Sequence, residues 1–365
     1  MSNARVLVAG WLNSPHVVAW GDALLELGYE VHLAGQLVER WPAAPGTERF
    51  ASVSVLDPGQ VPGVRDRRLG RGLAGAARAI RPELVHAHWA PGYGWMAARA
   101  GLRPLITSAW GSDLLRASRR LQARSRRALR GSDLVLADSG ELAAAARRLA
   151  PGVRVELVQW GVDLDRYRPD PGAREAARRR LGVDGGPVVL TTRALDPVYN
   201  PEVLLDAFER LRRRVPDAQL VLKHPGAELP SALAARVGEP GLAGAVHVVG
   251  FVDEDRLADL YRAADAYVSI PSSDSSPRSV WEALACGTPA VVSDLPWARE
   301  ALRDGETALL VPVEAEAVAA ALARLLGDPE AATRLGRDGR ALTLATMGRE
   351  DQLRRIARLY GELLA

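Results

Sequence analysis

The sequence predicts an α/β fold made of two doubly wound domains. Short β-rich apolar runs alternate with helical patterns along the chain, which is typical of parallel sheets covered by helices. The runs form two series, with a break near residues 166–171. A chain of 365 residues with 48% hydrophobic content can fill two ordinary cores but would strain a single one. We therefore expect two domains that bind ligands at the carboxyl ends of their strands.

Each series predicts six strands. In the first series they are residues 6–9, 30–33, 84–87, 105–107, 134–137 and 155–158, with an apolar helix at residues 16–27. In the second series they are residues 188–191, 219–222, 246–249, 266–269, 290–292 and 308–311. Residues 351–364 have the spacing of an amphipathic helix.

The net charge is only +3, but it is unevenly distributed. Residues 1–168 carry 23 arginines and 15 acidic residues, whereas the remainder carries 24 basic and 29 acidic residues. Residues 114–130 form an arginine-rich segment with a helical pattern, which is either a solvated helix face or a peripheral contact with anionic lipid. No nucleic-acid-binding motif accompanies this charge, so a nucleic-acid partner is not expected.

The single cysteine, Cys286, excludes an internal disulfide framework and indicates a reducing, cytoplasmic compartment. The apolar run at residues 5–10 is too short for a signal peptide, and no run approaches the length of a membrane span. Any membrane contact is therefore expected to be peripheral, at the inner face.

The most informative segment is residues 272–296, SSDSSPRSVWEALACGTPAVVSDLP. It places Asp274 and Glu282 eight positions apart across an expected helix start, with Ser276 as the cap and Pro277 in the first turn. The N–H groups of such a helix start bind anions, and Glu282 could accept hydrogen bonds from a diol. This arrangement predicts a sugar-nucleotide site.

The same segment resembles the Asp/Glu-x7-Glu signature of family-4 retaining glycosyltransferases, and the resemblance covers nearly the whole chain. It implies the GT-B fold: two Rossmann-like domains that face each other across a cleft, and a C-terminal helix that crosses back to the first domain. The implied domains are residues 1–167 for the acceptor, 168–348 for the nucleotide-diphosphate sugar, and 349–365 for the crossing helix.

The segment TTRALDPVYNPEVLLDAF resembles the diphosphate-binding segment of this family, in which an arginine is followed by a lysine. Here Arg193 is present, but Val198 occupies the lysine position and Tyr199-Asn200 follow. Lys223 is the only lysine in the chain and ends the next strand, so we expect it to replace the missing charge. The alternative is a structural arginine and a surface lysine.

The resemblance implies two groups of residues around the donor. The expected catalytic residues are Asp274, Arg193, Lys223 and His88. The expected donor-binding residues are Glu282 at the ribose, Ser275, Ser276, Arg278, Ser279, Gly250, Phe251, Tyr199 and Asn200.

In the first domain, LVHAHWAPGYG and ITSAWGSDLL also resemble family segments, but most relatives have His-Gly where this chain has Trp110-Gly111. A tryptophan offers one N–H donor and a flat face but no acid or base. The expected acceptor-binding residues are Asn13, His16, Trp89, Trp110, Gly111 and Asp113. For the two histidines, His16 and His88, packing or solvent exposure is the alternative to a role in chemistry.

The chain has nine tryptophans and only three phenylalanines. Five of the tryptophans are expected at or just beyond strand ends of the first domain: Trp11, Trp89, Trp95, Trp110 and Trp160. They predict a ring-lined acceptor pocket, with packing between the domains as the alternative.

Two acidic pairs could suggest a metal site. Asp163 and Asp165 lie in a segment that resembles the family's interdomain turn, and Asp253 and Asp255 precede a helix whose dipole favours acids. We therefore expect no metal and no cofactor beyond the nucleotide-sugar co-substrate.

The predicted activity is retaining transfer of a sugar, with a UDP-sugar favoured, to a small polar or ring-containing acceptor. The resemblance implies front-face attack assisted by the leaving phosphate. The alternatives are a lipid-linked or polysaccharide acceptor at a membrane surface, a sugar-nucleotide epimerase, and a sugar-nucleotide-binding scaffold that has lost its chemistry.

Overall fold

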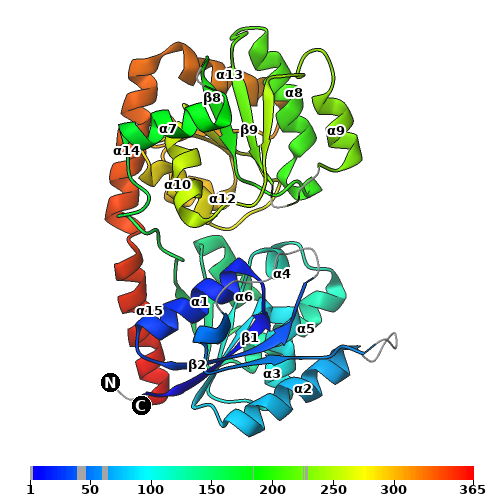
Figure 1. Cartoon of the computed structure of the whole chain (residues 1–365). Helices are drawn as coiled ribbons and strands as arrows, with labels where there is room; N and C mark the ends of the chain where they lie inside the picture. Colours follow the sequence, from blue (N-terminus) through cyan, green and yellow to red (C-terminus); the bar gives the residue numbers. More distant parts are fainter. Residues whose placement is uncertain (1–2, 39–46, 60–64, 184, 225, 227–228) are drawn as a thin grey trace. The chain divides into compact units, whose positions relative to one another are not determined.

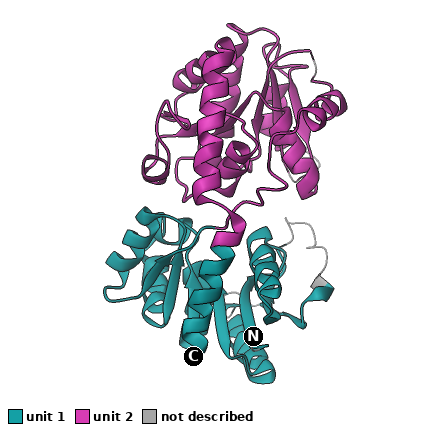
Figure 2. Ribbon diagram, turned by 90° about the vertical axis from the view of Figure 1, so that its left-hand side faces the viewer, with its two compact units in different colours: residues 1–159, 352–365 teal, residues 160–351 magenta. Residues whose placement is uncertain are grey.

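The computed structural model describes residues 3–38, 47–59, 65–183, 185–224, 226 and 229–365. The chain forms two compact units, unit 1 with residues 1–159 and 352–365, and unit 2 with residues 160–351 (Figure 2). Each unit contains one parallel sheet with helices on both faces (Figure 1). The prediction of two doubly wound α/β domains is confirmed. The chain crosses between the units at 159/160 and 351/352, whereas the sequence placed the borders at 167/168 and 348/349.

Unit 1 has a seven-stranded sheet in the order β3-β2-β1-β4-β5-β6-β7. Its strands are β1 (Arg5–Trp11), β2 (Glu30–Gln36), β3 (Ser52–Val55), β4 (Leu84–His88), β5 (Leu105–Ser108), β6 (Leu134–Ala137) and β7 (Val155–Leu157). Its helices are α1 (Pro15–Glu26), α2 (Arg65–Ile80), α3 (Trp95–Arg99), α4 (Ser112–Leu115), α5 (Arg119–Arg130) and α6 (Gly140–Leu149), with a 3-10 helix at Thr47–Arg49 and a π-helix at Trp89–Gly94.

Unit 2 has a six-stranded sheet in the order β10-β9-β8-β11-β12-β13. Its strands are β8 (Val188–Thr191), β9 (Gln219–Lys223), β10 (Val246–Val249), β11 (Ala266–Ser269), β12 (Ala290–Ser293) and β13 (Leu309–Val311). Its helices are α7 (Pro171–Leu181), α8 (Pro201–Arg212), α9 (Ser231–Val237), α10 (Glu254–Ala263), α11 (Arg278–Ala285), α12 (Pro296–Ala301), α13 (Ala315–Gly327) and α14 (Pro329–Thr346), with a 3-10 helix at Pro197–Tyr199.

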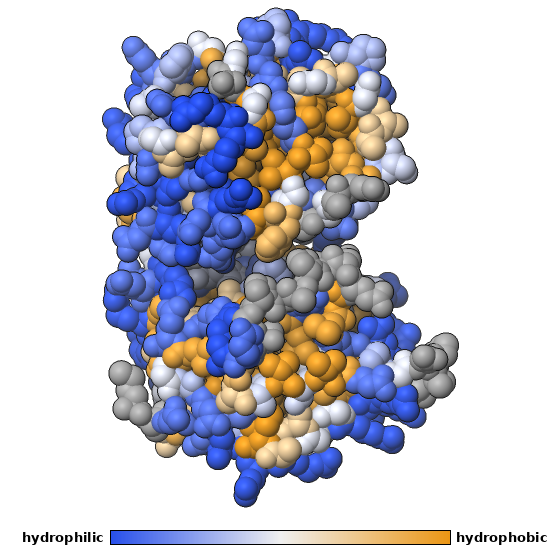
Figure 3. Space-filling model, viewed as in Figure 1, coloured by the Kyte–Doolittle hydropathy of each residue, from blue (hydrophilic) through white to orange (hydrophobic). Residues whose placement is uncertain are grey.

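The central strands are apolar on both faces because helices cover both sides of each sheet. In unit 2, residues 188–191, 266–269 and 290–293 are buried throughout. On the face shown in Figure 3, hydrophilic residues cover α7 and α10, and hydrophobic residues show between these helices and α8. Of the residues in α7, only Ala177 is buried, which fits a helix with a narrow apolar stripe.

The C-terminal helix α15 (Arg349–Leu364) confirms the predicted crossing to the first domain, since residues 352–365 belong to unit 1. Tyr360 anchors it there. Its hydroxyl accepts the indole N–H of Trp20 at 2.8 Å and lies 2.5 Å from Nδ1 of His86. None of the helices in the described part of the chain is long and apolar enough to span a membrane.

Two expectations about elements were wrong. The sequence analysis missed edge strand β3, a four-residue strand in which Val53 and Val55 are exposed. The basic segment at 114–130 is not one helix, because α4 ends at Leu115 and α5 starts again at Arg119. Ser118 has extended backbone and its hydroxyl accepts the N–H of Leu121, so it caps the second helix and separates it from the first.

Candidate functional site

The loops that carry the predicted donor residues diverge from the centre of the unit 2 sheet. Strand β8 lies between β9 and β11, in the strand order of a dinucleotide-binding fold. Arg193 follows β8, Lys223 ends β9, and Asp274 follows β11. The connections from β8 and β11 lead to opposite sides of the sheet, which opens a crevice at their carboxyl ends.

Arg193 and Asp274, which the sequence assigned to the diphosphate and the sugar, contact each other. The Arg193 guanidinium lies 2.6 Å from Oδ2 of Asp274 and donates to Oγ of Ser279 at 3.1 Å. It also stacks on the Tyr199 ring, 4.4 Å from its centroid. Burial is the largest single effect and lowers the pKa of Arg193, but Asp274 and the neighbouring tyrosines together outweigh it, so the pKa is raised. The guanidinium therefore stays charged inside the crevice.

The Arg193 side chain has one further donor. Its Nε–H is buried and has no hydrogen-bond partner within the described residues. A buried donor on a charged group is costly to leave unsatisfied, so an anion that reached it would be bound favourably.

Glu282 is 4% exposed and both of its oxygens have partners. Oε1 lies 2.7 Å from Nε of Arg278, and Oε2 accepts the Tyr261 hydroxyl at 2.9 Å. Burial raises the pKa of Glu282, while Arg278 and Tyr261 act in the opposite direction. A carboxylate has about four acceptor sites, so Glu282 can still accept hydrogen bonds from a ligand diol.

A buried hydroxyl cluster holds Tyr261 against Glu282. Oγ1 of Thr192 lies 3.1 Å from both Tyr261 Oη and Tyr267 Oη. Thr192 directly precedes Arg193, so the same loop positions the two charged groups. The sequence analysis missed this cluster, although the two tyrosines mark the buried faces of α10 and β11.

Lys223 lies within electrostatic range of this site. It is half-buried at the end of β9, and burial lowers its pKa while the Glu282 carboxylate acts to raise it. That Lys223 faces the same crevice as Arg193 stays a prediction. Its role at a diphosphate remains a prediction.

The predicted start of α11 was wrong by one residue. The helix begins at Arg278 with Pro277 at the cap position, and no side chain caps it. Ser276 has a positive φ of 51°, and its hydroxyl accepts the indole N–H of Trp281 at 3.1 Å. The backbone N–H of Ser275 donates to Asp274 Oδ1 at 2.9 Å. Asp274 therefore orders the loop that precedes the helix.

Asn200 joins the loop after β8 to the loop after β11. Its backbone is left-handed, with φ of 52°, and its amide donates to the Ile270 carbonyl at 2.8 Å and to Ser272 Oγ at 2.9 Å. Gly250 and Phe251 follow β10 and are exposed, with 61% of Phe251 accessible. The structure thus gives Asn200 a positioning contact and leaves Phe251 at the surface.

In unit 1, the end of β1 and the segments after β4 and β5 bring three of the predicted tryptophans together. The Trp11 ring lies 5.1 Å from Trp89 and 5.5 Å from Trp110, centroid to centroid. The exposed His16 ring packs against Trp110 at 5.3 Å. These four side chains form the aromatic cluster.

Trp95 lies apart from the aromatic cluster within unit 1, and a pocket lined by the five rings stays a prediction. Trp95 lies in α3, where its ring contacts the Arg124 guanidinium at 4.6 Å. Trp160 belongs to unit 2.

His88 lies beneath the aromatic cluster. It is fully buried and its Nδ1 accepts the indole N–H of Trp110 at 3.3 Å. Burial, with a smaller effect of His16, lowers the pKa of His88 to about 3, so the ring is neutral at physiological pH.

The sequence analysis missed a second histidine behind His88. The His86 ring stacks on His88 with centroids 4.4 Å apart, and its Nε2 lies 2.7 Å from Ser108 Oγ. Its other nitrogen contacts Tyr360 of α15. The spacing of two residues along β4 was the available signal, because alternate residues of a strand share one face.

The side chains of Asn13 and Asp113 hold the loops of unit 1 by hydrogen bonds to backbone groups. The Asn13 amide donates to the Val38 carbonyl at 2.8 Å and accepts the Val38 N–H at 2.9 Å. Asp113 is 1% exposed and accepts the N–H groups of Ala90 at 3.0 Å and Trp110 at 2.9 Å. Burial raises the pKa of Asp113 to about 6, although these N–H groups lower it. Gly111, with φ of 89°, allows the turn between them.

The acidic pairs form local contacts. Asp253 caps α10 by accepting the N–H of Arg256 at 2.8 Å, and Asp163 lies 3.1 Å from Arg166. Across the residues the structure describes, no group of three or more His, Cys, Asp or Glu side chains is placed to hold a metal ion. Metal independence remains a prediction.

Comparisons with known proteins identify the family. The model for "Glycosyl transferases group 1" matches residues 173–342, and the model for "Glycosyltransferase Family 4" matches residues 14–166. The D-inositol 3-phosphate glycosyltransferase of Thermobispora bispora is 30% identical over 98% of this chain and 90% of its own length. The chain belongs to the family-4 glycosyltransferases.

Other relatives are matched over less of their length. The D-inositol 3-phosphate glycosyltransferase of Rhodococcus opacus is 33% identical over 67% of this chain, but the chain spans only 60% of that relative. The fold also resembles Anabaena HepE, solved in complex with UDP and glucose, with a TM-score of 0.82, 19% identity, and coverage of 99% of this chain and 100% of HepE. The predicted GT-B fold is therefore confirmed.

Proposed function

We propose that the protein is a retaining glycosyltransferase that uses a nucleotide-diphosphate sugar, with UDP-sugars favoured. The observation that carries the proposal is the group of charged side chains at the switch point of unit 2, where Arg193, whose side chain is 14% exposed, pairs with Asp274 and the buried Glu282 lies one turn into α11. Family-4 membership and the complex of HepE with UDP and glucose support this choice of donor class.

The proposed roles follow the chemistry of each group. Glu282 accepts the ribose hydroxyls, and Asp274 accepts hydroxyls of the donor sugar. Arg193, through its buried Nε–H and its charge, stabilises the diphosphate as it leaves, assisted by Lys223. A single donor of this kind is worth about 3 kcal/mol in a transition state.

In the proposed reaction, the bond from the sugar C1 to the diphosphate oxygen breaks and its electron pair stays on the diphosphate. The acceptor hydroxyl attacks C1 from the same face, and its proton passes to the leaving phosphate oxygen. No covalent enzyme intermediate is needed, and the charge on the leaving group is balanced by side chains instead of a metal ion.

The acceptor is proposed to be a small polar or ring-containing molecule that stacks on the aromatic cluster of unit 1, since flat sugar faces pack well on indole rings. A lipid-linked acceptor is the second candidate. It is favoured by α5, on which Arg119, Arg120, Arg126, Arg127 and Arg130 are all exposed. In either case we expect the enzyme to act in the cytoplasm.

The test is thermal melting of the protein with UDP-, GDP-, dTDP- and ADP-sugars in the presence of EDTA. A ligand at about 100 times its dissociation constant stabilises the folded protein by roughly 2.7 kcal/mol. A rise confined to one nucleotide base supports the donor site and its independence of metal. Folded protein that shows no rise with any of these donors contradicts the proposal.

A further inference from the structure

Buried hydroxyl groups extend from the Glu282 carboxylate into the interior of unit 2. Oε2 of Glu282 accepts the Tyr261 hydroxyl at 2.9 Å. The Thr192 hydroxyl lies 3.1 Å from the hydroxyls of both Tyr261 and Tyr267, and Tyr267 also has a hydrogen bond with Ser279. Both tyrosines are completely buried. Solvent therefore does not compete for these contacts.

The same hydroxyl groups reach Arg193 at their other end. An N–H of the Arg193 guanidinium donates to the Ser279 hydroxyl at 3.1 Å. The resulting hydroxyl chain consists, in spatial order, of Arg193, Ser279, Tyr267, Thr192, Tyr261 and Glu282. A guanidinium can only donate hydrogen bonds, and an ionised carboxylate can only accept them. Arg278, whose Nε lies 2.7 Å from Oε1 of Glu282, favours the ionised carboxylate.

The two charged ends decide how each hydroxyl proton in the hydroxyl chain is used, because a hydroxyl group has a single proton. Tyr261 gives its proton to Glu282, so it can only accept from Thr192. Thr192 has then used its own proton and must accept from Tyr267. From the other end, Ser279 accepts from Arg193 and keeps its proton for Tyr267. Both ends predict the same direction, so every hydrogen bond runs from the guanidinium toward the carboxylate.

Hydrogen bonds that run in one direction polarise each other, and a buried, low-dielectric environment strengthens this effect. Donation to Glu282 is therefore stronger than an isolated tyrosine would provide. Ring packing does not require the hydroxyl groups, since the Tyr261 and Tyr267 rings contact each other edge to face with centroids 5.6 Å apart. Phenylalanine rings would make the same contact. The hydroxyl groups thus have a role that core packing does not explain.

We propose that Thr192 and Tyr261 are positioning residues that hold Glu282 ionised and fixed relative to Arg193, so that the ribose and the diphosphate of one nucleotide are bound together. This inference rests on the proposed function, which assigns the ribose to Glu282 and the diphosphate to Arg193. Thr192 is central to the hydroxyl chain and directly precedes Arg193. Its hydroxyl is therefore expected to affect both ends without contacting the ligand.

The first test follows the titration of Glu282 in the full chain without ligand, by NMR of ¹³C-labelled glutamate side chains, with the signal assigned by Glu282→Gln. Burial raises the pKa of Glu282, and the hydrogen bond from Tyr261 opposes this rise. Tyr261→Phe should therefore move the titration midpoint upward. Thr192→Val should move it in the same direction by a smaller amount, whereas Thr192→Ser keeps the hydroxyl and should not move it. Four other titratable or charged groups that act on Glu282 are unchanged in these variants: Arg278, Glu254, Tyr167 and Lys223.

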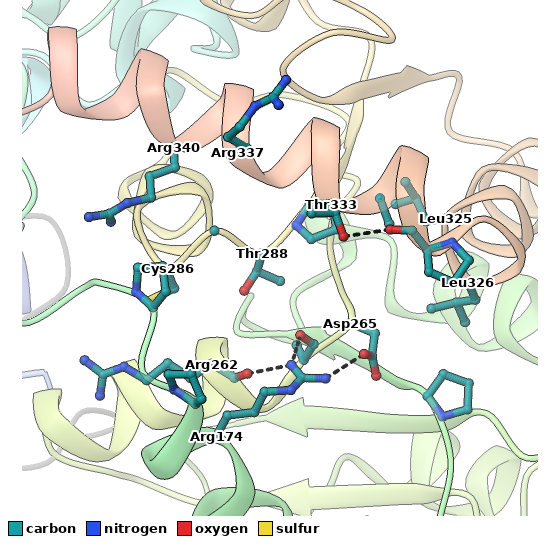
Figure 4. Close-up of a pocket in the computed structure, with 18 of the residues that line it drawn as sticks. Arg174, Arg262, Asp265, Cys286, Thr288, Leu325, Leu326, Thr333, Arg337 and Arg340 are labelled. Carbon is teal, nitrogen blue, oxygen red and sulfur yellow. Dashed lines mark hydrogen bonds and ion pairs between the residues drawn. The ribbon is translucent and has the colours of Figure 1, made fainter.

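Thr288→Val is the matched control. Thr288 is also a buried threonine that supports Tyr261, but its hydroxyl donates to the Tyr261 backbone carbonyl at 2.7 Å. It lines a pocket at the amino ends of β11 and β12, together with Asp265 and Cys286 (Figure 4). The substitution removes a buried hydrogen bond outside the hydroxyl chain, so it should leave the Glu282 midpoint in place. An equal shift in Thr288→Val and Thr192→Val would indicate a general structural effect and overturn the inference.

A second measurement follows binding of UDP by calorimetry in EDTA. Thr192→Val and Tyr261→Phe should each raise the dissociation constant about tenfold, the effect of weakening one hydrogen bond to a charged group. Thr192→Ser and Thr288→Val should bind UDP as the unmodified protein does. Unchanged UDP affinity in Thr192→Val, or an unmoved Glu282 midpoint in that variant, overturns the inference. A shifted midpoint in a protein that binds no UDP would contradict the proposed donor site but support the hydroxyl chain.

Discussion

Replacing Arg193 with alanine removes the positive partner of the ion pair at the centre of the proposed donor site. Arg193 and Asp274 lie 2.6 Å apart with side chains only 14% and 17% exposed. Removal of one partner from a buried ion pair typically costs about 3–5 kcal/mol, because the other charge stays buried and unpaired. Because both side chains keep some exposure to solvent, we expect the cost to be at the lower end of this range. Arg193→Ala should therefore lower the free energy of unfolding by about 3 kcal/mol. Asp274→Asn in the same background should restore part of it.

The assay is a double-variant cycle measured by urea denaturation, with Arg193→Ala, Asp274→Asn and both together. Arg210→Ala is the matched control, because its partner Glu316 lies 3.2 Å away but both side chains are about half exposed, and such pairs contribute only about 0–1 kcal/mol. A loss below about 1 kcal/mol for Arg193→Ala, or a coupling energy equal to that of the control pair, would refute the buried-pair argument. Both site variants should also lose stabilisation by the nucleotide-sugar, whereas the control should keep it.

Three further predictions concern other buried groups. Glu282→Gln should raise the dissociation constant for the donor about tenfold by calorimetry, since a charged acceptor is lost, whereas Glu330→Gln, at a carboxylate that is 91% exposed on α14, should leave it unchanged. Because the pKa of Asp113 is raised to about 6, the folded state holds its proton more tightly than the unfolded state, and this contribution to stability disappears as pH rises from 4 through 6. Denaturation over that range should therefore show a loss of up to about 3 kcal/mol that Asp113→Asn lacks, and a parallel pH profile in the variant would contradict the assignment. Tyr360→Phe removes the hydroxyl that lies 2.5 Å from His86 and should cost about 1–3 kcal/mol by denaturation, with an unchanged midpoint as the refuting result.

Most of the fold followed from the sequence, because buried parallel strands are short, apolar and regularly spaced. Residues 134–137, 188–191, 246–249 and 266–269 form strands with the predicted bounds. The sequence analysis did not predict edge strand β3, because its serines and exposed valines do not form the continuous apolar run of a central strand.

The charged part of the candidate site was also accessible from the sequence, because strand-end position and the spacing from Asp274 to Glu282 indicate which side chains converge. What remained hidden was how those side chains pair before a ligand binds. Ser276 does not cap α11, since the Trp281 indole engages its hydroxyl and the helix starts after Pro277. The contact between His86 and Tyr360 joins residues 274 positions apart, and no local pattern predicts such a contact.

The measurement that tests the central claim most directly follows the sugar released from the nucleotide-sugar that stabilises the protein best. The full chain is incubated with that donor in EDTA, and the first product is observed by proton NMR before the free sugar equilibrates between its anomers. We predict release of nucleoside diphosphate and of sugar with the same anomeric configuration as the donor, slowed strongly in Arg193→Ala. First release of the inverted anomer, or no nucleoside diphosphate from folded protein that binds the donor, would contradict the assignment as a retaining glycosyltransferase.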